Sequence, residues 1–378
     1  MSVAVIDIGK TNAKVVLVAD DGTEIAERRR PNTVLPGPPY PHFDADGLWS
    51  FVLESLADFA PRVGAVVPVT HGACAALVDE DGALALPVLD YEHAGPDEAR
   101  PTYAPPPFSE TGSPPLPGGL NLGAQLHWLE ARHPQGFARA RALLTWPQWW
   151  AFRLSGVMAS EVTSLGCHTD LWDPLAGRPS TLAVERGWAA LLPPLRGAAE
   201  ILGPAAREVA AATGLGPRTP IHAGIHDSNA SLLPYLHEAP CGVLSTGTWV
   251  IAMALGGRRA ALDPARDRLL NVAADGRPVP TARFMGGRRR DAAIAAGEDE
   301  SAVDARLARR AATDLEEIGA EGPIFVEGPF AASDAFMRAL SDAAGREART
   351  GDATGTARGA ALLARMGADP SRDRPAFA

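Results

Sequence analysis

The chain has 378 residues, of which 46% are hydrophobic and 21% are charged, so it can bury an ordinary core and we expect two domains. Its net charge of −10 argues against nucleic acid or an anionic membrane surface as a partner. The three cysteines are widely spaced, which excludes a disulfide framework. The sequence also lacks a membrane-spanning apolar run and an N-terminal signal pattern, so we expect a cytoplasmic protein.

The opening segment, VIDIGKTNAKVVLV, belongs to a predicted β-meander over residues 3–30. Its Gly9-Lys10-Thr11 resembles the end of a P-loop, but that motif needs an earlier glycine where this chain has Ala4. A P-loop also leads into a helix, whereas the residues that follow here are β-branched and end in the hairpin signal Asp21-Gly22. We therefore predict a first hairpin whose tip binds phosphate through Gly9, Lys10, Thr11, Asn12 and Lys14.

Only two of the 35 basic residues are lysines, Lys10 and Lys14, and both lie in this hairpin. A lysine ammonium is a compact point charge, which suits a phosphate where the wider guanidinium does not fit. Asp7 precedes the turn on an apolar strand, where a carboxylate needs a partner or a cation. We predict that Asp7 holds Mg²⁺ through water; the alternative is that it caps its own turn.

The residues that follow this meander in the first half predict strands and helices in an order typical of an α/β domain with a mixed sheet. A loop (31–47), a helix (48–60), a buried strand (63–72), a hairpin around Asp81-Gly82, an irregular excursion (94–120) and two helices (121–133 and 146–156) follow in turn. His71 and Gly72 end the buried strand, at the edge where α/β sheets bind ligands. We predict that they contact a ligand, and that Gln148, between Trp146 and Trp149, flanks a sugar face, because amides and aromatic rings suit polyols. Core positions would explain all of these residues equally well.

We place the boundary between an N-terminal domain (1–219) and a C-terminal domain (220–378) before the segment IHAGIHDSNASLL. This segment predicts a strand followed by a helix that begins at Asp227. Asp227 is the candidate general base that takes a proton from a substrate hydroxyl, and the helix N-terminus would keep it ionised. The alternative is a simple N-cap. His226 would hold a sugar hydroxyl, unless it is an ordinary core histidine.

The second half repeats the hairpin chemistry of the first. Residues 241–255 predict two strands around Ser245-Thr246-Gly247-Thr248, so Thr246, Gly247 and Thr248 are candidates for a second phosphate turn. Helices are predicted around 301–318 and over 355–367, and a strand, loop and helix over 323–345 place Gly328, Phe330 and Ser333 on the nucleoside side. Two hairpins that face each other across a cleft would grip one polyphosphate, as in actin, hexokinase and Hsp70.

Taken in order, the motifs resemble those of the FGGY carbohydrate kinases along nearly the whole chain. DIGKTNAK and LSTGTW resemble the two phosphate motifs of the family, and GIHDSNASL resembles its catalytic-aspartate segment, with a His-Asp pair most like the rhamnulokinase and fuculokinase branches. PVTHGACAALVDEDGALALPVLDYE resembles the sugar-pocket strand and hairpin. VEGPFAASDAFMRAL and GTARGAALLA resemble the adenosine-binding end.

This resemblance implies a two-domain actin-like fold, also termed ribonuclease H-like or hexokinase/Hsp70-like, with a mixed sheet in each domain and an interdomain cleft. It implies ATP- and Mg²⁺-dependent phosphorylation of a ketose such as fuculose or rhamnulose, or of a related polyol, with Asp227 as base and with Asp7 and Asp227 at the metal. It also implies that the sugar is contacted by His71, Gly72, Gln148, His226 and Asp227. The chain departs from the family by its short second domain and by the arginines in MGGRRRD (285–291). A non-catalytic sensor, or an actin-like ATPase acting on a protein, is the alternative from another class. A homodimer is left open.

Overall fold

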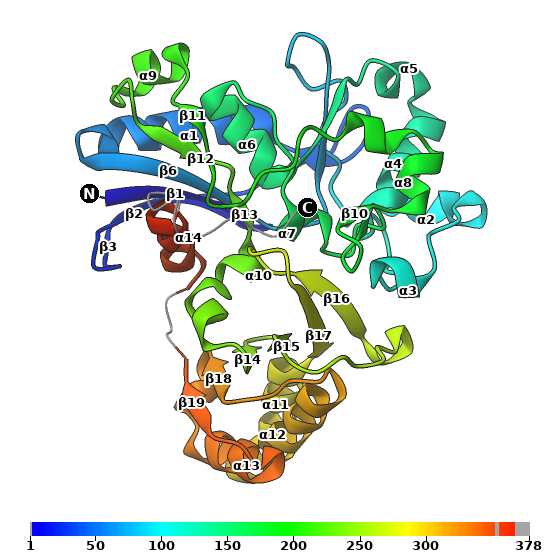
Figure 1. The fold of residues 1–378 in the computed structure, drawn as a ribbon, viewed down its shortest axis with the longest axis vertical. Helices are drawn as coiled ribbons and strands as arrows, with labels where there is room; N and C mark the ends of the chain where they lie inside the picture. The colour runs from blue at the N-terminus through cyan, green and yellow to red at the C-terminus, as the bar shows by residue number, and fades with distance from the viewer. Residues whose placement is uncertain (1, 352–354, 367–378) are drawn as a thin grey trace. The chain divides into compact units, whose positions relative to one another are not determined.

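The computed structural model describes residues 2–351 and 355–366, which form two compact units (Figure 1). Among the described residues, the first unit takes those of Met1–Leu233, Val272–Gly276 and Gly355–Ala378, and the second takes those of Pro234–Asn271 and Arg277–Thr354. The boundary predicted at residues 219 and 220 lies between two paired strands of the first unit, β11 (Ile201–Pro204) and β12 (Pro220–His222). Residues 220–233 therefore group with the first unit.

A seven-stranded mixed sheet forms the centre of the first unit, with the order β11-β12-β6-β1-β2-β3 and with β13 also paired to β6. Its other strands are β1 (Ser2–Ile8), β2 (Asn12–Val18), β3 (Glu24–Pro31), β6 (Val63–Thr70) and β13 (Ile225–His226). β6 runs parallel to β1, β12 and β13, whereas β1, β2 and β3 form the antiparallel meander that the sequence predicts. Asp21 closes the second turn of the meander by accepting a hydrogen bond from the Thr23 amide at 2.8 Å.

Helices flank both faces of this sheet. Figure 1 shows α1 (Ala45–Phe59) and α6 (Trp146–Ser155) on one side and α14 (Gly355–Met366) on the other. The α1 helix begins at Ala45, earlier than predicted, because the Asp44 side chain accepts from the Gly47 amide at 2.9 Å and caps it. The remaining α-helices of this unit are α2 (Gly95–Ala99), α3 (Phe108–Thr111), α4 (Leu122–Arg132), α5 (Pro134–Phe137), α7 (Val162–Leu165), α8 (Thr181–Glu185), α9 (Arg207–Thr213) and α10 (Asp227–Ala230).

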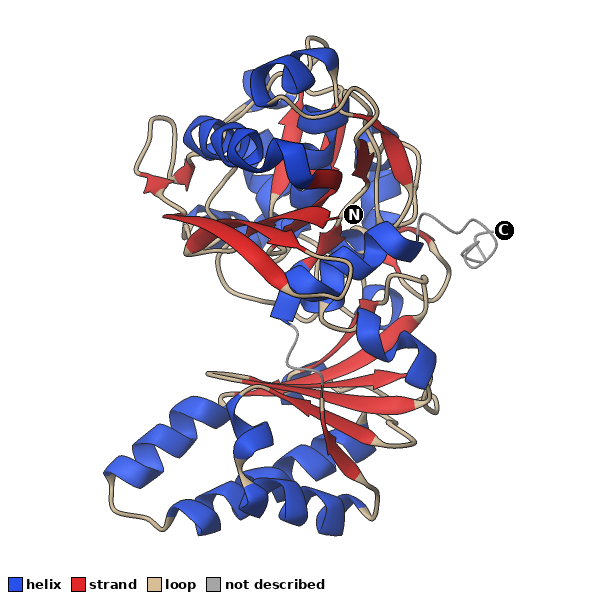
Figure 2. Ribbon diagram, turned by 90° about the vertical axis from the view of Figure 1, so that its left-hand side faces the viewer, coloured by secondary structure: helices blue, strands red, loops and turns tan. Residues whose placement is uncertain are grey.

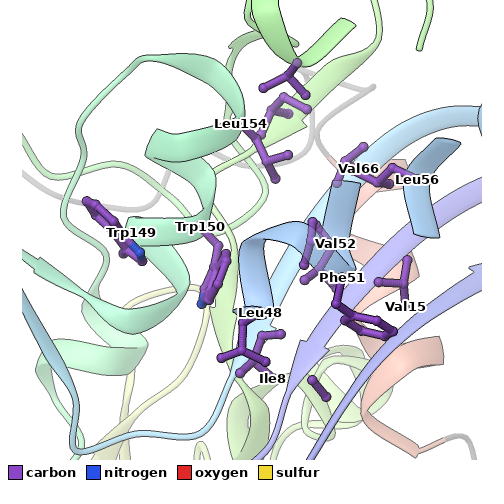
Figure 3. Close-up of a cluster of buried hydrophobic side chains, with 14 of the residues drawn as sticks. Ile8, Val15, Leu48, Phe51, Val52, Leu56, Val66, Trp149, Trp150 and Leu154 are labelled. Atoms are coloured by element: carbon purple, nitrogen blue, oxygen red, sulfur yellow. The ribbon is translucent and has the colours of Figure 1, made fainter. Parts of the chain in front are cut away.

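The main core of the first unit lies between the sheet and the helices α1 and α6 (Figure 3). Alternate residues of β1 and β2 point into it because side chains along a strand alternate between faces. Its fully buried members include Ile8, Val15, Leu48, Leu56, Val66 and Leu154. Burial of side chains of this size stabilises the fold by about 1.5–3 kcal/mol each. This packing holds the ends of β1 and β6 in fixed positions.

The hairpin predicted around Asp81-Gly82 forms, but its paired part is short. An isolated bridge joins Val78 to Leu84, and the Ala85 amide donates to the Leu77 carbonyl at 2.8 Å. The regular ladder of β7 (Ala75–Val78) is instead the antiparallel one with β8 (Ala142–Thr145). The segment after the turn contains Pro87, which lacks a backbone N–H and cannot continue a ladder. Two further small sheets join β4 (Val34–Leu35) to β5 (His42–Phe43) and β9 (Trp172–Asp173) to β10 (Arg178–Pro179).

The second unit contains a six-stranded mixed sheet of order β16-β17-β15-β14-β18-β19. The strands are β14 (Cys241–Thr246), β15 (Val250–Leu255), β16 (Arg268–Val272), β17 (Pro278–Phe284), β18 (Ile324–Glu327) and β19 (Ala348–Thr350). β14 and β15 form the predicted second hairpin. The sequence patterns did not predict β16 and β17, which extend the sheet beyond this hairpin.

Helices α11 (Gly286–Ala295), α12 (Glu300–Glu317) and α13 (Asp334–Ala344) gather on one side of this sheet, as Figure 2 shows. The amphipathic α12 buries Val303, Leu307 and Leu315 against the strands. Short 3₁₀ turns lie at Ala60–Arg62, Arg100–Thr102, Trp188–Leu191, Leu233–Glu238, Pro264–Arg266 and Pro329–Ala332.

The helix predicted over 355–367 corresponds to α14, and its last predicted residue lies outside the described residues. α14 packs against β1 and β6 of the first unit and against α10. Gly359 allows this approach, because a β-carbon at that position would overlap the carbonyl oxygen of Ala230. No helix in the described ranges is long and apolar enough to cross a membrane.

Candidate active site

Three neighbouring strands bring the predicted polar residues of the first unit together. In the β1–β6 register Asp7 is opposite Val69, and in the β6–β13 register Val69 is opposite Ile225. His71 follows the end of β6, and its amide donates to the carbonyl oxygen of Ile8 at 3.0 Å. Because these strands are parallel, their carboxyl ends meet at one edge of the sheet. Asp7, His71 and His226-Asp227 therefore converge, although they are far apart in the sequence.

Asp7 pairs with Lys14 across the first hairpin. The two residues are cross-strand partners, and Lys14 Nζ lies 3.1 Å from Asp7 Oδ2. Burial raises the pKa of the Asp7 carboxyl, the Lys14 ammonium opposes that rise, and the Asp227 carboxyl adds to it. The Asp7 side chain thus contacts a cation, and this contact to Lys14 differs from the turn-capping alternative.

The tip of the first hairpin is a tight turn held from outside. The Gly9 amide donates to the carbonyl oxygen of Asn12 at 2.9 Å, and a β-carbon on Gly9 would lie only 3.1 Å from that oxygen. Asn32 braces the turn, because its amide donates to the Thr11 carbonyl at 2.9 Å and its side-chain Nδ2 donates to the Gly9 carbonyl at 2.8 Å. The side chains of Thr11 and Asn12 remain exposed at the tip.

Asp227 is held by three donors that all reach the same oxygen. The Ser228 amide donates to Asp227 Oδ1 at 2.6 Å, the Ser228 hydroxyl lies 3.2 Å away, and His226 Nε2 lies 3.3 Å away. Asn229 Nδ2 can only donate, so its 3.2 Å contact to His226 Nδ1 places the imidazole proton on Nε2, facing Asp227. Burial raises the pKa of the Asp227 carboxyl and lowers that of His226 to about 4.

His71 is buried, and its two ring nitrogens have different surroundings. Its Nδ1 donates to the Gly72 carbonyl at 2.9 Å, so Nε2 is the unprotonated nitrogen of the neutral ring. His71 Nε2 is buried and has no hydrogen-bond partner among the described residues. Burial lowers the pKa of His71 to about 4, while the Asp227 carboxyl raises it in part. His71 therefore offers a neutral acceptor next to Asp227.

Two predicted sugar-contact residues have structural contacts instead of open groups. A β-carbon on Gly72 would lie 2.8 Å from His226 Nε2, so this glycine makes room for the imidazole. Gln148 is fully buried, donates to the carbonyl oxygens of Ala223 and Gly224 at 3.0 and 3.2 Å, and accepts from the Thr145 hydroxyl. The flanking Trp146 and Trp149 belong to the core, which matches the plainer alternative for that helix.

Lys10 has carboxylate partners where the sequence predicts a phosphate. Its Nζ contacts Asp90 and lies 3.2 Å from Glu92 Oε2. The same ammonium lies 5.0 Å from the ring centroid of Phe43 and 4.7 Å from that of Tyr91, within the range of cation–π attraction. We call these five residues, Lys10, Phe43, Asp90, Tyr91 and Glu92, the Lys10 cluster.

The second hairpin turn lies in the other unit and is joined to the loop after β18. The Thr246 hydroxyl donates to the Glu327 carbonyl and accepts from the Phe330 amide at 3.1 Å. Gly328 has φ +81°, and a β-carbon there would overlap the Thr246 carbonyl, so only glycine fits. The Gly247 amide donates to the Trp249 carbonyl at 2.9 Å and closes the turn, with Thr248 at its exposed corner.

The nucleoside-side candidates after β18 are largely occupied by protein contacts. Phe330 is buried and packs on Phe336 with ring centroids 4.9 Å apart. Ser333 caps α13 by accepting from the Phe336 amide and donates to Asp304 Oδ2 at 2.6 Å. Arg290 joins the same group, because its Nε lies 2.6 Å from Asp304 Oδ1. Their nucleotide roles stay predictions.

Five arginines line a cavity of about 570 Å³ within the second unit. Trp249, which follows the second turn, lines it and has 39% of its surface exposed. The arginines of this lining are Arg266, Arg283, Arg288, Arg289 and Arg310. Two of the three arginines in MGGRRRD thus face this cavity, whereas the third binds Asp304.

No three His, Cys, Asp or Glu side chains within residues 2–351 and 355–366 form a group able to hold a metal ion by themselves. Mg²⁺ is usually held by one or two carboxylates together with phosphate oxygens and water. The arrangement of Asp7 beside Asp227 is compatible with that mode, and their metal role stays a prediction.

Several site residues were not predicted from the sequence, because their contacts join positions that are far apart along the chain. Asn32 braces the first turn from a loop, and Asp90 meets Lys10 from 80 positions away. Glu161 accepts from the Thr163 hydroxyl at 2.6 Å, and Thr163 Oγ1 in turn accepts from the His226 amide at 3.1 Å. In the sequence, Glu161 is distinguished only as an acidic residue within an otherwise apolar stretch.

Comparisons with known proteins agree with these features. The family model "FGGY family of carbohydrate kinases, N-terminal domain" matches residues 110–234, and "Carbohydrate kinase FGGY, C-terminal domain" matches residues 238–312 and 290–373. L-fuculokinase of Escherichia coli (strain K12) is 26% identical over an alignment of 276 residues, which covers 66% of this chain. The match spans just over half, 56%, of the length of that curated relative.

Among solved structures, a carbohydrate kinase from Novosphingobium aromaticivorans is 37% identical, with a TM-score of 0.88 over 97% of this chain and 91% of that chain. Xylulose kinase from Rhodospirillum rubrum shares the fold at 19% identity, with a TM-score of 0.78 over 99% of this chain and 91% of that one. The expected two-domain α/β fold of the actin-like ATPase type, with a mixed sheet in each domain, is confirmed. The chain belongs to the FGGY family of carbohydrate kinases.

Proposed function

We propose that this protein transfers a phosphoryl group from ATP to a hydroxyl of a sugar or polyol, with Asp227 as the general base. The observation that carries the proposal is the asymmetry of the Asp227 carboxylate. Its Oδ1 is held by the Ser228 amide and faces His226 Nε2, whereas Oδ2 has no donor among the described residues. A carboxylate that is fixed by one oxygen can take a proton on the other without losing its orientation.

The electrostatics around Asp227 favour this role. Burial raises the pKa of its carboxyl, which makes the carboxylate a better proton acceptor than an exposed one. His226 and His71 stay neutral above about pH 4, because burial lowers the pKa of each imidazole to about 4. Neither histidine therefore carries a charge near neutral pH: His226 orients Asp227 through Nε2, and His71 Nε2 can accept a hydrogen bond from a ligand.

His71 is the second element of the proposed acceptor side. Its Nε2 accepts hydrogen bonds and has no partner among the described residues. A hydroxyl of the acceptor can donate to this nitrogen, while a neighbouring hydroxyl donates to Asp227. A hydroxyl pair of this kind is present in ketoses and polyols. The loss of a buried, unsatisfied acceptor on binding favours such a ligand.

The residues for ATP and Mg²⁺ follow the sequence predictions. The exposed tip of the first hairpin, with Lys14 at its base, and the turn at Thr246–Thr248 would hold the phosphates. Asp7, with Asp227 nearby, would orient a hydrated Mg²⁺, whose contribution is to neutralise charge on the phosphate oxygens. The fit rests on Asp7: among the described residues its buried carboxyl pairs with one ammonium, that of Lys14, and the charge of the Asp227 carboxyl raises its pKa in addition to burial.

The acceptor is proposed by analogy with the relatives. The curated match is an L-fuculokinase, so L-fuculose is the first ketose to test, followed by L-rhamnulose and D-xylulose. An ADP-release screen over ketoses, aldoses and polyols tests the proposal, with Mg²⁺-ATP held constant. We expect sugar-dependent ADP release with at least one neutral acceptor, and a phosphorylated sugar in equal amount. ADP release without dependence on any acceptor would instead support an ATPase.

A further inference from the structure

The Lys10 cluster lies beside the proposed acceptor groups of the first unit. The ring of His71 is 5.2 Å from that of Phe43 and 5.5 Å from that of Tyr91, centroid to centroid. In addition to the effect of burial, the charge of Lys10 lowers the pKa of His71, and the charge of Asp227 raises the pKa of Tyr91. Lys10 thus faces the same neighbourhood as the base, although it stands in a hairpin tip predicted to bind phosphate.

Two carboxylates already neutralise the Lys10 ammonium. Asp90 is buried and contacts Nζ, and Glu92 Oε2 lies 3.2 Å from it. Only 18% of the Lys10 side chain is exposed. An incoming anion would have to compete with these two carboxylates for the ammonium. Lys10 is therefore a poor receptor for a phosphate or a carboxylate.

The other charged groups nearby lead to the same conclusion. Two ammonium groups, those of Lys10 and Lys14, face four carboxyl groups, which belong to Asp7, Asp90, Glu92 and Asp227. Burial raises the pKa values of Asp7 and Asp227, but even when both are protonated these six groups carry no net positive charge. His71 and His226 add no charge near neutral pH.

We infer that the acceptor is an uncharged polyol or ketose, that sugar acids are excluded, and that the Lys10 cluster makes this distinction. The inference rests on the proposed function and adds the substrate class. Each ammonium has three N–H donors, and two are directed to carboxylates here, which leaves one for an acceptor oxygen. Asp90 and Glu92 can accept from hydroxyl hydrogens. Vicinal hydroxyls both accept and donate, so they match this mixed set, whereas a second carboxylate would add a like charge.

The composition of the chain supports a dedicated role for this lysine. Arginine takes nearly every basic position, yet a lysine occupies the space between two aromatic rings and two carboxylates. A guanidinium is planar and wider, and cannot take the place of a compact ammonium in such a site without moving the rings. We therefore expect Lys10→Arg to lose acceptor affinity although the charge is kept.

Matched neutral and anionic ligands test the inference directly. D-xylulose and D-xylonate, and L-fuculose and L-fuconate, differ mainly by the carboxylate. We expect the wild-type protein to bind at least one neutral member in titration calorimetry without ATP, and to bind its acid on the order of 100-fold more weakly, because like charges at close range are strongly unfavourable. Binding of an acid as tightly as its neutral partner, or binding of no neutral ligand at all, would overturn the inference.

Charge-neutralising variants locate the discrimination. Asp90→Asn/Glu92→Gln should reduce the preference for the neutral ligand at least 10-fold, and Glu92→Gln alone should reduce it less, because 66% of the Glu92 side chain is exposed. Glu80→Gln/Asp81→Asn removes the same number of charges at the exposed tip after β7 and should leave the preference unchanged. An unchanged preference in both Lys10-cluster variants, with native circular dichroism, would contradict the assignment.

The two proposals fail in different ways. If the calorimetric preference holds but no ligand is phosphorylated, the substrate class stands and the kinase proposal falls. If sugar acids are phosphorylated as efficiently as neutral sugars, the kinase proposal stands and this inference falls.

Discussion

His226 Nε2 lies 3.3 Å from Asp227 Oδ1, and the contact of Asn229 with His226 Nδ1 fixes the proton on the side that faces the carboxylate. The imidazole therefore acts as a neutral donor that orients Asp227. The chain builds this pair from a two-residue strand that pairs with β6 and a four-residue helix that begins at Asp227. Both residues occupy fixed positions relative to the end of β6.

Loss of the His226 donor should alter the base as well as the rate. In His226→Phe the carboxylate loses one hydrogen bond, which disfavours its ionised form and raises the pKa of Asp227 further. The rising limb of the pH profile of kcat/KM should therefore move to higher pH, with kcat reduced about 10- to 100-fold. His237→Asn, at an exposed position, is the matched control. A lower rate without a shift of the profile would indicate a purely structural role for His226.

Gly72→Ala should disturb the same pair by a steric route. The added methyl group would lie 2.8 Å from His226 Nε2, closer than a carbon and a nitrogen normally approach, so the imidazole must move away from Asp227. We expect kcat to fall at least about 10-fold with native circular dichroism, because misplacement of a catalytic group by an ångström is costly. Gly203→Ala, where the nearest atom is 3.9 Å away, should keep full activity. Equal activity of both variants would show that the imidazole position does not matter.

Lys14 should act mainly on the nucleotide. Lys14→Ala removes the ammonium that lies 3.1 Å from Asp7, and we expect a higher KM for ATP with a smaller change in kcat. Arg29→Ala, on the neighbouring strand with its guanidinium on exposed Glu27, provides a control that also removes one positive charge. An unchanged KM for ATP in the Lys14 variant would remove this residue from the phosphate site.

The stability of the protein should depend on pH in two opposing ways. Burial lowers the pKa of His71 and His226 from 6.5 to about 4, so the unfolded chain binds more protons between pH 4 and 6.5. The free energy of unfolding therefore rises with pH in this window, by on the order of 3 kcal/mol for each histidine. Burial raises the pKa of Glu161 from 4.5 to about 7, so its contribution is lost as the pH rises from 4.5 to 7.

Urea unfolding at several pH values separates the two effects. His71→Gln should flatten the rise in the free energy of unfolding below pH 6.5, whereas Glu161→Gln should remove a decrease between pH 4.5 and 7. If both variants keep the wild-type pH dependence, these groups do not titrate differently in the folded and unfolded states.

Local sequence patterns predicted the elements whose hydrogen bonds close over short distances. The meander over residues 3–30, the β14–β15 hairpin and the α12 helix follow from alternation, turn residues and helical spacing. The pairing of β7 with β8 does not follow from local patterns, because β8 lies far along the chain and the segment after Asp81-Gly82 also has the pattern of a strand. β16 and β17 were missed in the stretch between the second hairpin and α11.

Part of the candidate site could also be predicted from the sequence. Asp7, His71 and Asp227 stand at the ends of strands, so their convergence follows once the strands are known to be neighbours. The partners of Lys10 were not predictable, because a flexible side chain can reach several directions from a hairpin tip. Only the structure shows that it meets Asp90 and Glu92.

The most direct test of the account measures acceptor-dependent ADP release by Asp227→Ala at saturating ATP and sugar. Asp342→Ala, at an exposed position on α13, serves as the control. We predict that kcat falls about 10²- to 10⁴-fold in the Asp227 variant and is unchanged in the control, since a general base contributes on this scale. Sugar phosphorylation by Asp227→Ala at the wild-type rate would contradict the assignment of this carboxylate as the base.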